Sequence, residues 1–231
     1  MNWRLLRGPW TDPHKNVLLE EAILNLTERE ASPWTLRLWV NGRSVIVGAY
    51  QGLEDVQTEF CLRERIPVLR RVTGGGTVYH DHGNLNWSLF APRRLVGSDV
   101  HAVYRILSNP VVNALKKLGI YAEFSPPNSV RVRGFKVSGM AAYVKKRVVL
   151  CHGTLLVDAD LECMTRAIRV RDRVANVSSF VERATVEGVE KAVEESFSET
   201  FGVELTEQGP TERELYFVRS PPASFRSSRL L

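Results

Sequence analysis

The stretch RRVTGGGTVYHDHGNLNWS, residues 70–88, carries the chain's densest set of chemically useful side chains. Three adjacent glycines at 74–76 let backbone N–H groups approach an anion closely and tolerate positive φ angles. Arg70 and Arg71 stand just upstream, and arginine can hold a carboxylate or phosphate in a fixed fork. The spacing fits neither a P-loop nor a GxGxxG fingerprint. A glycine-rich turn with exposed arginines is the alternative interpretation.

The composition around this stretch is that of a globular protein. The 231 residues are 44% hydrophobic and 25% charged, enough for a core without disulfides or structural metals. The net charge of +5 suits anionic ligands or an acidic protein partner, and is too small for a dedicated nucleic-acid binder. Cysteines 61, 151 and 163 form no CxxC pair, which argues against a disulfide framework or a zinc site. With no apolar signal region and no 18-residue apolar run, we expect a soluble, cytoplasmic protein.

Hydrophobic periodicity predicts an alternation of helices and strands. Strands 35–40 and 44–47 flank Asn41-Gly42, which predicts a hairpin with a type I′ turn. A first helix is expected to begin at Asp12-Pro13 and to run through Leu26, before the Glu28–Glu30 charges, and others are expected at 52–65, 99–118, 160–168 and 186–201. Further strands are expected at 66–72, 84–90, 129–135, 135–144 and 148–157. This order predicts an α+β fold, a mainly antiparallel mixed sheet flanked by helices.

Two more segments contain candidate functional residues. Lys136 lies on a predicted strand among apolar residues, where it either clamps a phosphate or carboxylate or points outward into solvent. His152, in Cys-His-Gly-Thr, is either a functional group or a core histidine. His80 and His82 have no third ligand in sight, so the sequence predicts no metal site there.

Together these segments resemble the lipoate–protein ligase family. The motifs are RRVTGGGTVYHDHGNLNWS at 70–88, KVSGMAAY at 136–143 and HGTLLVDADL at 152–161, with WVNGRSVIVGAYQ at 39–51 and RVRDRVANVSSF at 169–180 in the expected order. The resemblance covers residues 12–205. It implies the catalytic-domain fold that lipoate ligases share with biotin–protein ligases and octanoyltransferases.

The resemblance also implies a two-step reaction. Lipoate and Mg²⁺-ATP would form lipoyl-AMP, and the lipoyl group would then pass to a lysine of an acceptor domain. Lys136 would be the catalytic group, bridging the carboxyl oxygen and the α-phosphate. The acceptors implied are lipoyl domains of 2-oxoacid dehydrogenase complexes or the glycine-cleavage H protein. The implied residues of the substrate and lipoyl-AMP site are Trp39, Arg71, Thr73, Gly74, Gly75, Gly76, Thr77, Val78, Tyr79, His80, Asn128, Ser138, Gly139, His152, Gly153 and Thr154.

The chain departs from the family pattern in three places. Ser129 follows Asn128 where members carry an Asp associated with magnesium, so the metal ligands are left open. Ala49 stands where an Arg is common. We expect residues 1–220 to form the catalytic domain and 221–231 a mobile basic tail, with no C-terminal accessory domain. An accessory domain would then be a separate small subunit, unless the chain acts alone.

Two other functions fit the same fold. An octanoyl- or lipoyltransferase would use an acyl-protein donor and a cysteine nucleophile instead of ATP. Its cysteine would precede the motif lysine in the region of residues 124–127, Phe-Ser-Pro-Pro, which has none. Cys151 neighbours His152, but adjacent strand residues point to opposite faces, so its thiol should face away from the site. A non-catalytic protein that binds lipoyl domains is the second alternative.

Overall fold

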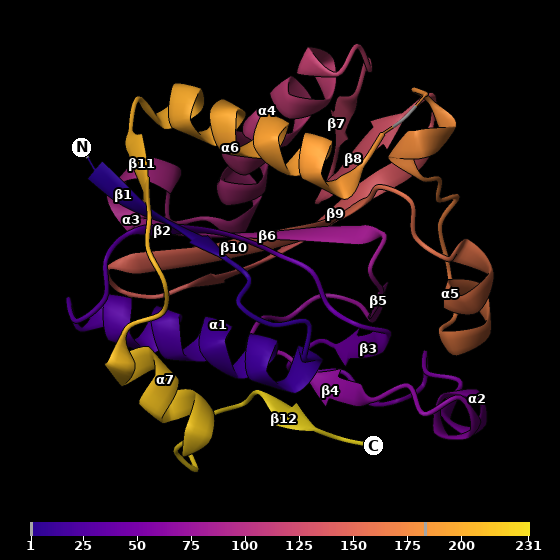
Figure 1. Ribbon diagram of the computed structural model, residues 1–231, viewed down its shortest axis with the longest axis horizontal. Helices are drawn as coiled ribbons and strands as arrows, with labels where there is room; N and C mark the ends of the chain where they lie inside the picture. Colours follow the sequence, from indigo (N-terminus) through magenta and orange to yellow (C-terminus); the bar gives the residue numbers. More distant parts are fainter. Residues whose placement is uncertain (1, 183) are drawn as a thin grey trace.

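The computed structural model describes residues 2–182 and 184–231, and its strands form two sheets (Figure 1). The larger contains β1 (Asn2–Arg7), β2 (Thr35–Trp39), β6 (Asn84–Pro92), β7 (Glu123–Ser125), β8 (Ser129–Val132), β9 (Phe135–Val144), β10 (Val148–Leu156) and β11 (Glu204–Glu207). The smaller contains β3 (Ser44–Val47), β4 (Val68–Arg70), β5 (Val78–His80) and β12 (Ser228–Arg229). The helices are α1 (Pro13–Glu28), α2 (Thr58–Arg63), α3 (Arg93–Val96), α4 (Val100–Lys117), α5 (Leu161–Ala167), α6 (Val186–Phe201) and α7 (Glu212–Arg219).

Pairing in the larger sheet is mainly antiparallel. The strand order is β11-β1-β2-β6-β10-β9-β8-β7, and only the pairs of β1 with β2 and with β11 are parallel in this sheet. β6 and β10 form its centre, in register from Val148 opposite Pro92 to Leu156 opposite Asn84. The predicted α+β class and mixed sheet are confirmed.

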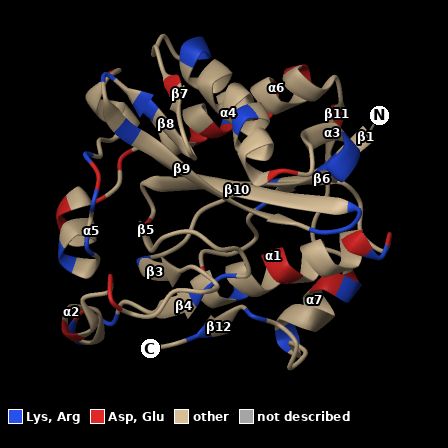
Figure 2. Cartoon of the chain, turned by 180° about the vertical axis from the view of Figure 1, so that it is seen from behind, with Lys and Arg blue, Asp and Glu red and all other residues tan. Residues whose placement is uncertain are grey.

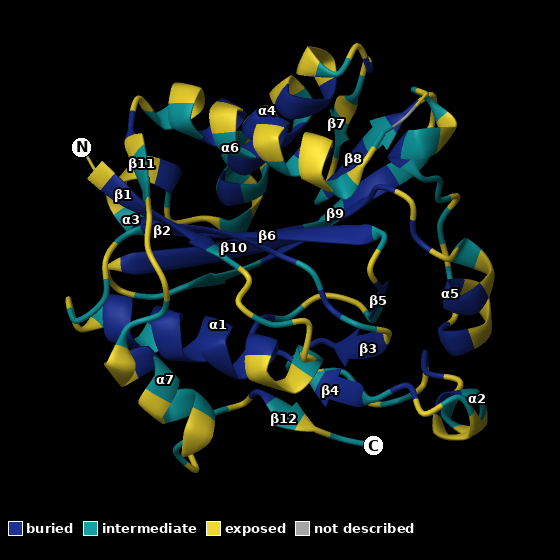
Figure 3. Cartoon of the chain, in the orientation of Figure 1, coloured by how far each residue is buried: buried dark blue, intermediate teal, exposed yellow. Residues whose placement is uncertain are grey.

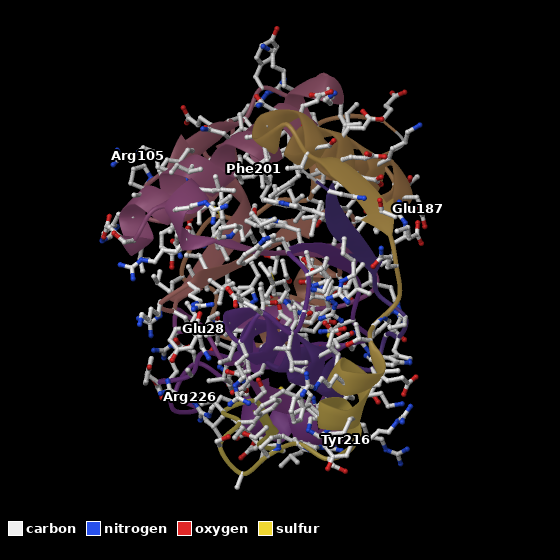
Figure 4. All side chains as sticks on the ribbon, turned by 90° about the vertical axis from the view of Figure 1, so that its left-hand side faces the viewer. Glu28, Arg105, Glu187, Phe201, Tyr216 and Arg226 are labelled. Atoms are coloured by element: carbon white, nitrogen blue, oxygen red, sulfur yellow. The ribbon has the colours of Figure 1, made fainter. Side chains whose placement is uncertain are left out.

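Helices cover both faces of the larger sheet. α4 and α6 lie on one face, and α1, α7 and the smaller sheet lie on the other (Figures 1 and 4). Successive side chains of β6 point to opposite faces of the sheet. Trp87 and Leu89 pack with α4 and α6 on one face, and Phe90 packs with Leu19 and Ile23 of α1 on the other. The central strands are accordingly buried along their length (Figure 3).

α1 begins as the sequence predicts. The Asp12 carboxylate accepts hydrogen bonds from the N–H groups of His14 and Lys15, and Pro13 occupies the first helical position. Most of the helix is buried, because it lies between the two sheets and α7. This placement brings Glu20 into the interior with only 2% of its surface exposed.

The predicted Asn41-Gly42 hairpin is wrong. β2 pairs with β1 and β6, whereas β3 pairs with β4 and β5 of the other sheet. A type I′ turn needs positive φ at both central residues, and neither Asn41 nor Gly42 has it. Asn41 is instead buried, where its side chain bonds to Asn16 at 2.8 Å and His80 at 3.0 Å. The chain crosses between sheets here because these buried partners hold it.

Other differences lie near the chain's ends and in short elements. The predicted helix 52–65 is reduced to α2, and the patterns missed β1, β5, β7, β11, β12, α3 and α7. Residues 221–231, expected to be mobile, are packed in this structure. The buried Glu21 carboxylate accepts hydrogen bonds from the N–H groups of Arg226 and Ser227, and β12 pairs with β4.

No helix within the described residues is long and apolar enough to cross a membrane.

Candidate active site

A cleft between the two sheets holds most of the predicted site residues. Its first half lies beside α1, β6 and β10, and its second half lies beside α5 and residues 168–174. The two halves share six lining residues, Gly76, Thr77, Val78, Lys136, Gly139 and Thr154. These six mark the junction of the two halves.

Arg71 holds the glycine run in place from within. Its guanidinium donates to the carbonyls of Gly74 and Gly76, both at 2.7 Å, and to that of Ile46 at 3.1 Å. Gly75 has φ of +86°, and a side chain at Gly48 would meet the Gly75 carbonyl at 2.1 Å. Burial lowers the pKa of Arg71 to about 10, so it stays charged at neutral pH. Arg71 therefore shapes the loop as well as lining the cleft.

A chain of hydrogen bonds continues from Arg71 along the wall of the first half. Arg71 Nε donates to the Thr73 hydroxyl at 3.0 Å, and that oxygen lies 2.8 Å from His152 Nε2. His152 Nδ1 lies 2.9 Å from Oε1 of Glu20. Ser88 donates to the same oxygen at 2.6 Å and accepts from Trp39 Nε1 at 2.9 Å. One buried network thus joins the glycine loop to α1, β2, β6 and β10.

Glu20 is the charged centre of this network. Burial alone would raise the pKa of its carboxyl, but His152, Arg37 and the Ser88 hydrogen bond lower it to about 2. An ionised carboxylate only accepts hydrogen bonds, so Nδ1 of His152 must donate. The histidine ring is therefore fixed in its orientation against the cleft.

His80 is neutral and has one unused polar atom. Burial, with the charges of Arg71 and His152, lowers its pKa to about 3. Its Nδ1 accepts from the Asn41 amide at 3.0 Å, so the ring proton lies on Nε2. Within the described residues that Nε2 is buried without a partner, as is the hydroxyl of Ser138 in the second half. Both residues line the cleft, His80 in the first half and Ser138 in the second.

Lys136 stands at the junction of the two halves. Its backbone N–H donates to the carbonyl of Arg173 at 2.8 Å, which fixes the start of β9. A Cβ at Gly139 would lie 2.9 Å from its Cε, so the glycine makes room for the lysine chain. Burial lowers the pKa of Lys136. In the described part of the chain its amino group has no hydrogen-bond or ion-pair partner, which favours an anionic ligand beside it.

Of the predicted site residues, all but three line the cleft. The first half is lined by Trp39, Arg71, Gly76, Thr77, Val78, His80, Asn128, Lys136, Gly139, His152, Gly153 and Thr154, and the second half adds Tyr79 and Ser138. Thr73, Gly74 and Gly75 line neither half: Thr73 bonds to His152, and Gly74 and Gly75 pack against Tyr50 and Gly48. These three residues support the loop but do not line the cleft.

The predicted site residues do not include several residues that line the cleft. Glu20, Asn86 and Met140 line the first half. Asp55 and Asp172 line the second half, and each is bound by an arginine, Arg171 at 2.6 Å and Arg131 at 2.7 Å. Residues 169–180 belong to a motif of the family resemblance, but none of them is among the predicted site residues. Glu20 is harder to predict as a cleft residue from the sequence, since a glutamate on a helix is usually exposed to solvent.

Neither a metal cluster nor a thiol occurs in the cleft. No group of three His, Cys, Asp or Glu side chains within residues 2–182 and 184–231 could hold a metal ion. The three cysteines are buried in the core, outside both halves. Cys151 packs with the α4 and α6 side of β10, opposite His152, and burial raises the pKa of its thiol. The predicted orientation of Cys151 is confirmed.

Comparisons with known proteins identify relatives of this chain. Residues 12–198 match the model of the lipoyl protein ligase A/B catalytic domain. A putative lipoate-protein ligase A of Aeropyrum pernix is 38% identical over 71% of this chain. Lipoate-protein ligase LplJ of Bacillus subtilis is 35% identical over 74% of it. The chain spans 61% and 54% of the lengths of these two relatives. It spans 86% of lipoate-protein ligase A subunit 1 of Thermoplasma acidophilum, which is 32% identical over 88% of this chain.

Solved structures show the same likeness. The putative lipoate protein ligase of T. acidophilum with bound lipoic acid superposes with a TM-score of 0.87 at 30% identity, covering 95% of this chain and 94% of its own. A lipoate-protein ligase A bound with ATP gives 0.85 at 31% identity, covering 95% and 93%. A bipartite ligase of T. acidophilum, solved in a study with its E2 lipoyl domain, gives 0.84 at 32% identity, covering 95% and 91%. By domain match, sequence identity and fold, the chain belongs to the lipoate–protein ligase family.

Proposed function

We propose that this chain activates lipoate with ATP to give lipoyl-AMP, and then transfers the lipoyl group to a lysine of a lipoyl acceptor domain. One observation carries the proposal: the unpartnered amino group of Lys136 lies where the two halves of the cleft meet. Relatives with lipoic acid bound and with ATP bound give each half a candidate occupant.

The first step brings two anions together. A carboxylate oxygen of lipoate attacks the α-phosphorus of ATP, a new P–O bond forms, and pyrophosphate leaves. Like charges repel, so the site needs a fixed cation beside the reacting oxygens. Lys136 supplies this cation, because it stands on strand β9 with its side chain lining both halves of the cleft, and Gly139 leaves room for that side chain.

The second step needs no protein nucleophile, since the adenylate is already an activated acyl donor. The acceptor amine, in its neutral form, attacks the acyl carbon, AMP leaves, and the new amide nitrogen loses a proton. Positioning and charge stabilisation supply the catalysis. We assign Trp39 and His152 to the wall of the acyl pocket, His80 and Ser138 to polar contacts, and residues 77–79 to the adenylate side of the cleft.

Magnesium would enter with ATP. Mg²⁺ keeps several waters and takes one or two protein carboxylates besides the phosphates, so a ready-made cage of acidic residues is not required. Asp55 and Asp172 are the carboxylates in the second half, and both are partly neutralised by arginines. The site therefore fits an ion held mainly by ATP, with Asp55 or Asp172 as an outer partner. Such an ion would neutralise charge on the phosphates.

The proposed activity also implies protein partners. We propose acceptor lipoyl domains of 2-oxoacid dehydrogenase complexes or the glycine-cleavage H protein. We also propose a separate small accessory subunit, since this chain covers 86% of one subunit of the Thermoplasma ligase, which is bipartite.

The test is the intact mass of an apo acceptor domain after incubation with this chain, lipoate and Mg²⁺-ATP. The expected result is the gain of one lipoyl group that disappears when ATP is left out. Parallel reactions supply lipoyl-AMP in place of lipoate and ATP, which separates a need for the accessory subunit in the first step from a lack of transfer. A chain that modifies the acceptor under neither condition contradicts the proposal, and transfer from an octanoyl-carrier protein without ATP would make it a transferase.

A further inference from the structure

Residues 168–174 run along the second half of the cleft between bridges to Val56 and to Lys136, and their exposure alternates. Arg169, Arg171 and Arg173 are exposed, whereas Val170, Asp172 and Val174 between them are half-buried. Successive side chains of an extended chain point to opposite sides. Val170 and Val174 pack against the core cluster beside β3 and α5, and the three arginines are exposed, with Arg169 and Arg171 also lining the second half of the cleft.

Backbone hydrogen bonds tie this segment to the catalytic lysine. Lys136 N–H donates to the Arg173 carbonyl at 2.8 Å, and Ala175 N–H donates to the Lys136 carbonyl at 3.2 Å. At the other end Arg169 N–H donates to the Asp55 carbonyl at 2.8 Å. The arginines therefore stand on a fixed support directly beside Lys136.

Two arginines of the neighbouring strands extend this edge. Arg131 on β8 binds Asp172 through two contacts of 2.9 and 2.7 Å, and Arg133 is exposed in the turn before β9. In Figure 2, Lys and Arg positions, coloured blue, lie on β8, on β9 and on the chain that leads from α5 toward these strands. We name the five residues Arg131, Arg133, Arg169, Arg171 and Arg173 the arginine rim.

The charge of the rim is only partly compensated. Asp172 binds Arg131, and Asp55 binds Arg171, whose side chain is still 68% exposed. Within the described residues Arg133, Arg169 and Arg173 have no carboxylate partner, and Arg173 stacks on the Phe135 ring at 4.6 Å. Alternate residues of an extended chain lie about 6.5–7 Å apart, so the like charges on the segment repel one another. An acidic surface placed against the rim would relieve this repulsion.

We propose that the arginine rim is the docking surface for the acceptor protein, and that this acceptor carries acidic side chains around its target lysine. The proposal rests on the proposed function, because it names the surface that delivers the lysine to Lys136. Arg169 and Arg171 also line the second half of the cleft, whereas Arg133 and Arg173 line neither half, so a role in holding ATP phosphates does not account for these two. Complementary charges at the edge of an interface mainly raise the rate of association and orient the partner protein.

The test measures transfer from preformed lipoyl-AMP to an apo lipoyl domain with acidic residues around its lysine, using the full chain. The variant Arg133→Glu/Arg173→Glu changes two rim arginines that line neither half of the cleft and leaves the two ion pairs of the rim intact. Arg213→Glu/Arg219→Glu, exposed on α7, changes the net charge equally at a distant place. We expect about a tenfold rise in the KM for the acceptor in the rim variant at low salt, unchanged kcat, and wild-type behaviour in the control. The difference should shrink at about 0.5 M salt, where exposed charges are screened.

The outcomes separate the two proposals. An unchanged KM for the acceptor, or an equal rise in the α7 variant, overturns docking at the rim and leaves the proposed function standing. A raised KM for lipoyl-AMP in the rim variant also overturns it, since the arginines would then belong to the nucleotide site. If the wild-type chain transfers nothing from lipoyl-AMP, the proposed function fails and the docking proposal fails with it.

Discussion

Oε1 of Glu20 on α1 lies 2.9 Å from Nδ1 of His152 on β10, although the two residues are 132 positions apart in the chain. This contact orients the histidine ring, so that Nε2 meets the Thr73 hydroxyl at 2.8 Å. Thr73 in turn accepts from Arg71, which holds the carbonyls of the glycine loop. Glu20 is thus linked to the carbonyls of the glycine loop through three side chains, those of His152, Thr73 and Arg71.

The substitution Glu20→Gln tests this network. The amide removes the buried negative charge that faces Arg37 and His152, so we expect a loss of roughly 2–4 kcal/mol in the free energy of unfolding. We also expect a KM for lipoate raised by about tenfold with a smaller change in kcat, because the pocket wall loosens. Urea unfolding and steady-state kinetics measure the two effects.

Glu21→Gln is the matched control, one residue further along α1. Its carboxylate binds the backbone of Arg226 and Ser227, outside the cleft. It should lower stability without changing the KM for lipoate. Equal effects of both substitutions on that KM would show that Glu20 acts only through stability.

His80 should make the fold sensitive to acid. Its pKa is about 3 in the folded chain and 6.5 in a model peptide, so the unfolded chain binds a proton first as the pH falls. Stability is therefore complete above about pH 6.5 and is lost toward pH 3, at up to about 1.4 kcal/mol per pH unit. In His80→Gln this part of the slope should disappear from urea unfolding curves between pH 6.5 and 4. An unchanged slope would mean that another group causes the acid sensitivity.

Lys136→Met removes the charge and keeps an unbranched apolar chain. We expect adenylate formation, measured by pyrophosphate exchange in the presence of any required accessory subunit, to fall by about 100-fold or more. Stability should be unchanged or slightly higher, because the amino group has no partner within the described residues and its burial lowers its pKa. Full activity in this variant would contradict the central role of Lys136.

Alkylation tests the transferase alternative. Cys61, Cys151 and Cys163 are all buried, and burial raises the pKa of Cys61 and of Cys151. Iodoacetamide should therefore leave the native chain unmodified by mass and fully active. Rapid inactivation together with one carbamidomethyl group would indicate a reactive thiol, as a cysteine-dependent transferase requires.

Local sequence patterns predicted the long helices and strands and the glycine loop, but not the contacts between segments far apart in the sequence. α6 matches its predicted range 186–201, because period and caps are local signals. The Asn41-Gly42 turn failed because its geometry is set by Asn16 and His80, which the local pattern does not contain. Glu20 was missed for the same reason, since only packing between the sheets buries it. The resemblance supplied Lys136 and His152, which spacing alone left undecided.

Gly139 and Gly153 should respond differently to the same added methyl group. In Gly139→Ala the new Cβ would lie 2.9 Å from Cε of Lys136, the mobile end of a side chain that can move aside. In Gly153→Ala it would lie 2.8 Å from the indole ring of Trp87, which is fully buried and cannot move. We therefore expect Gly139→Ala to lower the rate of adenylate formation by about tenfold or more at nearly normal stability, because a small misplacement of a catalytic group is costly. Gly153→Ala should instead cost roughly 1–3 kcal/mol of stability through overpacking. Gly209→Ala, with no atom within 4 Å of the added Cβ, is the control for both, and thermal unfolding with pyrophosphate exchange measures the set. If Gly139→Ala loses stability rather than rate, the close fit of that glycine serves the core and not the lysine.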